Sequence, residues 1–113
     1  MTLLQLDFYL FCIVALGGAL MAALIGLKVR VPAVFSNGHG LLAMLALGIL
    51  LAANLTSHVP NLAWWAFATL GAGFLGGGLL FRILFKDRAP LKLVAAHAFL
   101  GTTGLVLLYL SAF

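Results

Sequence analysis

Charged residues are nearly absent from this sequence. Asp, Glu, Lys and Arg together make up 7% of the 113 residues, whereas 65% are hydrophobic and the mean hydropathy is +1.27. In an average soluble domain about a quarter of the residues are charged. The shortage of charge therefore excludes an ordinary soluble domain and indicates an integral membrane protein whose first partner is the lipid bilayer.

Cysteine is as scarce as charge. The single cysteine, Cys12, excludes an internal disulfide bond and any iron–sulfur or zinc site that is built from several thiolates. We interpret Cys12 as an apolar packing residue. Any cofactor chemistry must therefore come from other side chains.

Long apolar runs fill nearly the whole sequence. Four of them, at about residues 3–27, 32–57, 62–85 and 90–112, reach the roughly 20 residues that cross a bilayer core. The first run has no basic segment before it and is expected to be retained rather than cleaved as a signal peptide. The sequence predicts an all-α membrane protein, with residues 1–113 forming one up-down bundle of four transmembrane helices.

The few cations predict how the bundle is oriented. The first loop and the surroundings of the third hold all six, namely Lys28, Arg30, Arg82, Lys86, Arg88 and Lys92. By the positive-inside rule, these loops face the cytoplasm and both termini face outward. We expect a bacterial inner-membrane protein with periplasmic termini. The net charge of +4 then needs no nucleic-acid partner.

Rare residues of the first half recur in the second half at the same spacing. A shift of 58 residues aligns Lys28, Arg30, Pro32 and His39 with Lys86, Arg88, Pro90 and His97. The shift predicts two parallel two-helix repeats, residues 1–55 and 59–113, related by an axis along the membrane normal. A shared need for basic loops and helix-starting prolines would explain the cations and prolines, but not the histidines.

The two aligned histidines are the candidate ligands. His39 and His97 each follow a helix-starting proline by seven residues, which places both about 10 Å along their helices on the cytoplasmic side. The second and fourth helices are diagonal neighbours in an up-down bundle, so the imidazoles can face each other. Two imidazoles suit a haem iron, one on each face, whereas a bare metal ion needs more ligands.

This plan resembles that of membrane b-type cytochromes, of the cytochrome b and b561-like kind. In that family a haem lies inside a four-helix bundle, histidines of the second and fourth helices bind its iron, and glycines of the first and third helices make room for it. The glycines here gather in the same spans, at Gly17, Gly18, Gly26, Gly71, Gly73, Gly76, Gly77 and Gly78. The resemblance implies haem b bound by His39 and His97, beside Gly18, Gly76 and Gly77. A Gly73-x-x-x-Gly77 pattern also suits plain helix packing.

The cations and the third histidine can also be assigned roles beside the implied haem. Arg82, Lys86 and Arg88 could pair with haem propionates on the cytoplasmic side, as cations do with carboxylates. Family members that carry electrons across the membrane usually hold two haems with four histidines. The third histidine here, His58, has no partner in the sequence, so one haem is expected. His58 is interpreted as an interfacial residue or a hydrogen-bonding partner of a quinone.

The sequence leaves several functions open. A haem with two histidine ligands has no free position on its iron, which favours electron transfer over catalysis, with a quinone, a homodimer or a larger complex completing the path. Otherwise the histidines form a polar contact between helices or a quinone site. The chain would then be an accessory subunit of a membrane complex. A small dimeric transporter is the weaker alternative, because Asp7, the one acidic residue of the first span, lies near the membrane edge.

Overall fold

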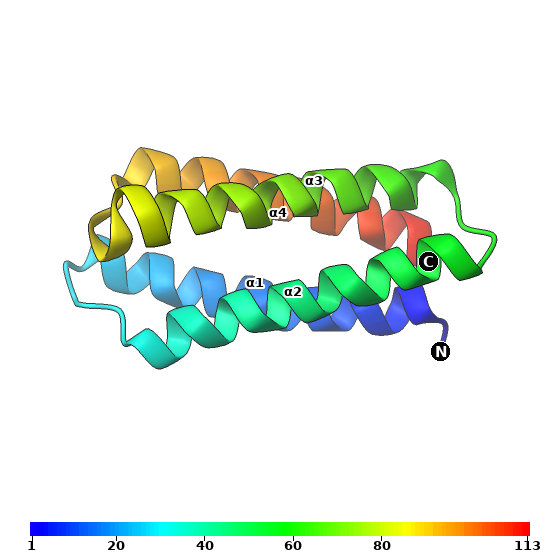
Figure 1. Cartoon of the computed structure of the whole chain (residues 1–113), viewed down its shortest axis with the longest axis horizontal. Coiled ribbons are helices and arrows are strands. Elements are labelled where there is room, and N and C mark those ends of the chain that lie inside the picture. Colours follow the sequence, from blue (N-terminus) through cyan, green and yellow to red (C-terminus); the bar gives the residue numbers. More distant parts are fainter.

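The computed structural model shows four long helices joined by short connections (Figure 1). It describes residues 1–113, except for the side chain of Asp87. The elements in chain order are α1 (Leu3–Gly26), α2 (Ala33–Thr56), α3 (Asn61–Gly78), the π-helical segment η1 (Leu79–Leu84), the 3₁₀ turn η2 (Lys86–Arg88) and α4 (Leu91–Ala112). The prediction of an all-α four-helix bundle is confirmed, and the helix ends fall within a residue or two of the predicted spans.

Each helix is long and apolar enough to cross a membrane. The spanning stretches have 22 to 24 residues, and η1 continues α3 so that the third stretch is Asn61–Leu84. About 20 residues are needed for the bilayer core. The helices therefore have the length and the composition of transmembrane segments.

Prolines set the starts of three helices. Pro32, Pro60 and Pro90 are the N-cap residues of α2, α3 and α4. Each has an extended ψ, and its carbonyl oxygen accepts a first helical hydrogen bond, for example 3.0 Å from the Phe35 N–H to Pro32. Proline suits this place because its own N–H would have no helical partner. The sequence placed Pro32 and Pro90 in the first turn of their helices, and the structure puts both one position earlier, at the N-cap.

The basic connections bend through left-handed lysines. Lys28 has φ 58° and Lys86 has φ 53°. After α1 the Val29 N–H donates to the Leu24 carbonyl at 2.9 Å and the Lys28 N–H to the Ile25 carbonyl at 3.0 Å, the two bonds of a Schellman cap. Glycine usually occupies this position, so a lysine here is strained. The 58-residue shift aligns these two lysines, as a duplicated hairpin would.

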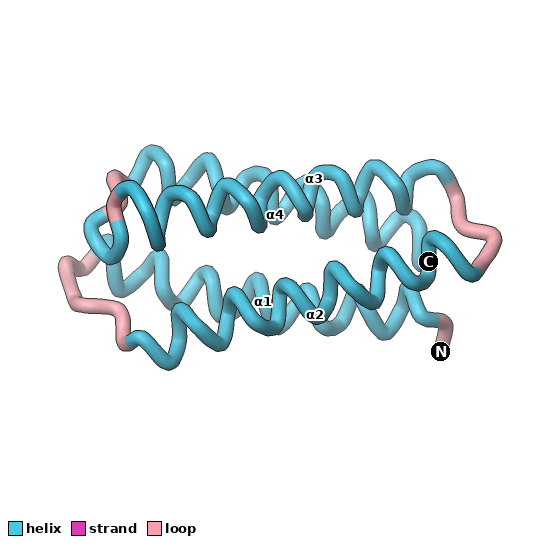
Figure 2. The backbone as a smooth tube through the Cα atoms, viewed as in Figure 1, coloured by secondary structure: helices cyan, strands magenta, loops and turns pink.

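The helices run alternately up and down (Figures 1 and 2). α1 packs against α2 and α4, and α3 packs against α4 and α2, so α2 and α4 are diagonal partners. The bundle measures 44 × 22 × 21 Å. At one end, the basic end, lie the α1–α2 and α3–α4 connections; the terminal end holds both termini and the α2–α3 loop.

The tightly packed core occupies only part of the bundle's length. Buried residues run from the terminal end as far as Val14 in α1 and Gly73 in α3, they begin at Ala43 in α2, and in α4 they extend to Val94. Leu50 and Leu108 at its centre are fully buried. Towards the basic end most side chains are half-buried or exposed. The two predicted histidine ligands lie where the packed core stops.

Candidate functional site

His39 of α2 and His97 of α4 meet inside the bundle. Their ring centroids are 6.3 Å apart, and the ring planes form an angle of 68°. Both side chains are half-buried, and the Nδ1 atom of each is buried without a hydrogen-bonding partner. The diagonal placement of α2 and α4 thus brings together the two side chains that the sequence singled out.

A glycine of a neighbouring helix lies against each imidazole. A Cβ atom on Gly18 of α1 would lie 3.1 Å from Cε1 of His39, and one on Gly77 of α3 would lie 2.6 Å from Cε1 of His97. Gly17 is slightly further from His39, at 3.7 Å from Nδ1. Gly76, the third predicted glycine, is different, because an added Cβ meets nothing within 4 Å. The histidines therefore need glycine at positions 18 and 77 for their close approach to α1 and α3.

The two glycines that lie against the imidazoles also leave backbone carbonyl groups uncovered. The backbone of Val14 faces His39, and the backbone of Gly73 faces His97. These residues precede Gly18 and Gly77 by four positions, which is one helical turn. A helical side chain covers the turn before its own Cα atom, so a glycine leaves the carbonyl of that turn open to a neighbour.

The π-helical segment η1 supplies two further neighbours. Phe81 contacts His97 edge to face, with centroids 5.4 Å apart. The guanidinium of Arg82 crosses to α2 and donates a 2.6 Å hydrogen bond to Oδ1 of Asn37. An added Cβ on Gly40 would lie 3.8 Å from the same guanidinium. Arg82 thus reaches α2 on both sides of His39, and π-helical turns of this kind often occur at functional sites.

The other predicted cations lie further out. Lys86 and Arg88 belong to η2 at the basic end, and both are exposed. Arg88 lines a separate cavity with residues of the α1–α2 loop. Arg82, the third cation that the sequence assigned to propionates, is exposed as well, and it contacts α2, the helix that carries His39.

A cavity leads from the surface of the bundle to His39. It has a volume of about 290 Å³ and lies between α1 and α2, with walls that include Val14, Gly17, Phe35, Gly38 and His39. Phe35 is 48% exposed on the outer side of the bundle. An apolar molecule in the lipid phase could therefore approach one histidine from the side.

The third histidine is remote from this site. His58 is exposed in the α2–α3 loop at the terminal end. Among the side chains that the structure describes, no three of His, Cys, Asp and Glu lie together as a metal-binding group. The candidate site thus consists of the imidazoles of His39 and His97 and the two glycines that lie against them, Gly18 and Gly77.

The sequence reasoning missed a buried acid. Asp7, which was placed near the membrane edge, is fully buried in α1 near the terminal end, and neither carboxylate oxygen has a hydrogen-bonding partner. Asn54 is also buried; its amide donates to the Ala63 carbonyl at 3.2 Å, while its Oδ1 has no partner. Asp7 shares the buried face of α1 with Leu4 and Phe11, but α1 is apolar on all sides, so the sequence carried no signal for this burial.

Comparison of the chain with known protein families, with curated proteins and with solved structures gave no match. The class of protein rests on the fold: a four-helix bundle whose helices are long and apolar enough to span a membrane.

Proposed function

We propose that this protein is a membrane cytochrome that holds one haem b between His39 and His97 and transfers electrons. The observation that carries the proposal is the distance between the two imidazoles. Two metal–nitrogen bonds of about 2.0 Å, plus about 1.1 Å from each nitrogen to its ring centre, add up to roughly 6 Å. The observed separation of the ring centroids is 6.3 Å.

Glycines let the two imidazoles lie close to α1 and α3, which supports their role as the proposed ligands. Gly18 and Gly77 carry no side chain at the level of the two rings, and Cβ atoms there would collide with the imidazoles or press on them. The cluster of buried apolar residues ends near this level, and Ala89 and Val94 are the buried apolar side chains further towards the basic end.

The exposed carbonyl groups favour the orientation that iron ligation needs. A histidine that binds a metal through Nε2 almost always donates its Nδ1–H to a carbonyl or a carboxylate. Nδ1 of His39 and of His97 is buried and free of other partners, and the backbones of Val14 and Gly73 face the two rings. With Nδ1–H donated to these backbones, the Nε2 atom of each histidine would remain available for the iron.

The cations of the chain support a haem whose propionates point to the basic end. Arg82 is the candidate partner for the propionates of a haem that points to the basic end, and its guanidinium already reaches α2 through its bond to Asn37. Arginine binds carboxylates with two parallel hydrogen bonds and is well suited to this role. We place the basic end on the cytoplasmic side of a bacterial inner membrane, as the positive-inside rule requires.

The chemistry that haem supplies here is one-electron transfer, because two histidines leave no open position on the iron. The residues of the chain hold the ligands, shield the site and orient the propionates. A lipid-soluble quinone is the candidate electron partner. The cavity between α1 and α2 reaches His39 beside the exposed side chain of Phe35, which gives such a molecule a path to the haem edge.

The test is an absorption spectrum of the purified protein, oxidised and then reduced with dithionite. We expect a low-spin b-type spectrum in the wild type that His39→Ala and His97→Ala each disrupt and that their combination abolishes. His58→Ala is the matched control, because His58 is exposed at the opposite end. It should keep the full spectrum.

A colourless wild-type protein from cells that are well supplied with haem would refute the proposal. So would a spectrum that survives in the double variant. The histidines would then be a polar contact between helices, and an accessory subunit of a membrane complex would become the leading alternative.

A further inference from the structure

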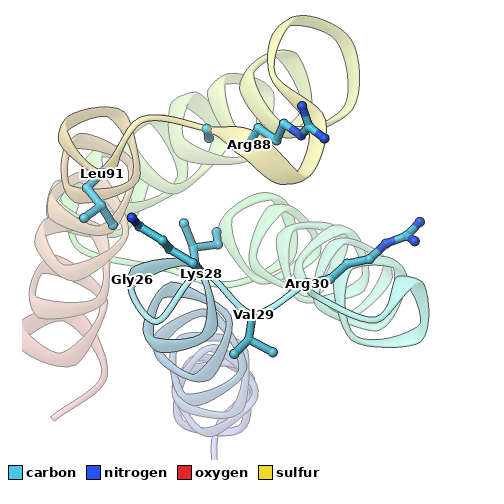
Figure 3. Close-up of a pocket in the computed structure, with 8 residues that line it drawn as sticks. Gly26, Lys28, Val29, Arg30, Arg88 and Leu91 are labelled. Carbon is cyan, nitrogen blue, oxygen red and sulfur yellow. The ribbon is translucent and has the colours of Figure 1, made fainter.

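A second cavity lies at the basic end, where the two basic connections approach each other (Figure 3). Its volume is about 770 Å³. The walls combine cationic and apolar side chains, among them Ile25, Lys28, Val29, Arg30, Arg88 and Leu91. A cavity with these two kinds of wall suits a ligand that carries a negative charge next to an apolar part.

The cations that line the cavity come from both connections, and their charged ends point in different directions. In Figure 3 the amine of Lys28 points towards Leu91 at the start of α4, whereas Arg30 and Arg88 extend to the other side. Lys28 and Arg30 come from the α1–α2 loop, and Arg88 comes from η2 before α4. The K-x-R segments of both predicted repeats therefore contribute to one cavity.

The backbone of Lys28 argues that its position matters. Its φ of 58° lies in the left-handed region, where glycine or asparagine is preferred and a lysine costs free energy. Orientation in the membrane needs cations somewhere in the loop, but it does not need one at the strained residue of the cap. Strained residues are typical of ligand clamps, where a bound group offsets the cost.

We propose that this cavity binds a phosphate group, supplied either by the headgroup of an anionic phospholipid or by free phosphate. Arginine and lysine are the usual partners of phosphate in proteins. Basic pockets between transmembrane helices at the cytoplasmic surface commonly hold anionic headgroups. A cavity of about 770 Å³ exceeds the size of one phosphate, and Ile25, Val29 and Leu91 can contact the glycerol and upper acyl carbons of a lipid. The site does not depend on haem.

The test is lipid binding to the full chain in detergent, counted by native mass spectrometry. Short-chain phosphatidylglycerol and phosphatidylcholine are titrated separately, and inorganic phosphate is added as a competitor. We expect saturable binding of phosphatidylglycerol, with Lys28→Gln weakening it about tenfold through the loss of one charge-assisted hydrogen bond. Lys92→Gln is the matched control, because it removes one charge at the same end from an exposed residue outside the cavity.

A second variant fills the cavity without changing charge. Gly26 lines the cavity, and an added Cβ there meets nothing within 4 Å, so Gly26→Leu should fold and yet exclude the lipid. The helical content of each variant is checked by circular dichroism. Competition by millimolar phosphate would assign the site to free phosphate, and resistance to it would assign the site to the lipid. Equal weakening in Lys28→Gln and Lys92→Gln, or full binding in Gly26→Leu, would overturn the proposal.

Discussion

Two residues without side chains govern the geometry around the histidines. Gly18 and Gly77 lie directly against His39 and His97, and each occupies the neighbouring helix at the level of the ring. The sequence pointed to glycines in the first and third spans but could not say which of them face inward. The repeat aligned Gly18 with Gly76, whereas the structure turns Gly77 to the histidine and leaves Gly76 with free space beside it.

Adding one carbon at Gly77 should disturb the site. In Gly77→Ala the new Cβ would lie 2.6 Å from Cε1 of His97, closer than atoms can approach, so the ring must move. Overpacking of this kind costs about 1–3 kcal/mol, and retention of the haem that we propose should fall by about tenfold or more. The measurement is haem per protein after purification.

Gly78→Ala is the control for this prediction. It adds the same carbon one residue later, where nothing lies within 4 Å, and should retain haem as the wild type does. Equal haem content in the two variants would contradict the role of Gly77.

At the level of the helices, a third glycine, Gly104, determines how closely α3 and α4 approach each other. Gly104 of α4 is buried against Leu70 of α3, and an added Cβ would lie 2.5 Å from Cγ of Leu70 and 3.3 Å from its backbone nitrogen. Lipid tails are as apolar as the core, so transmembrane helices gain stability mainly from such close contacts. The contact belongs to the packed part of the bundle.

Gly104→Ala should therefore loosen α3 from α4. We expect it to lower the free energy of unfolding by about 1–3 kcal/mol, because Leu70 is held by buried neighbours and cannot move aside freely. The measurement is denaturant-induced unfolding in detergent, followed by circular dichroism.

Gly101→Ala is the matched change on the same helix. It meets nothing within 4 Å and should be neutral or slightly stabilising, since alanine is the better helix former. Comparable losses in the two variants would mean that helix propensity, rather than the contact with Leu70, determines the effect.

At the scale of the whole molecule, the bundle has two unlike ends. The packed core and the buried Asp7 lie towards the terminal end, while the histidine pair and the loop cavity lie towards the basic end. The exposed Tyr9, Trp64 and Tyr109 are on the terminal side, where aromatic residues suit a membrane interface. The cations predict that the basic end faces the cytoplasm.

This orientation can be measured with thiol labelling. Cys12→Ser removes the one native cysteine and gives a background for Ser57→Cys in the α2–α3 loop and Val29→Cys in the α1–α2 loop. A membrane-impermeant maleimide should label Ser57→Cys in intact cells and Val29→Cys only after lysis, because positive loops stay inside. The reversed pattern would show that the basic end faces outward.

Local sequence features determined the helices, their ends and the arrangement of the loops. Runs of apolar residues set the lengths, and prolines and polar connections set the boundaries, because these effects act within a few residues of the chain. The even number of spans placed both termini at the same end. The pairing of His39 with His97 was predicted from their depth along parallel helices, which also depends only on counting residues.

The tertiary structure alone decided which face of each helix points inward. A transmembrane helix is apolar on all sides, so hydrophobic periodicity gives no rotation about its axis, and packing against the neighbours fixes it. That rotation made Gly77 rather than Gly76 the partner of His97, turned Asp7 into the core and exposed the carbonyls of Val14 and Gly73 to the histidines.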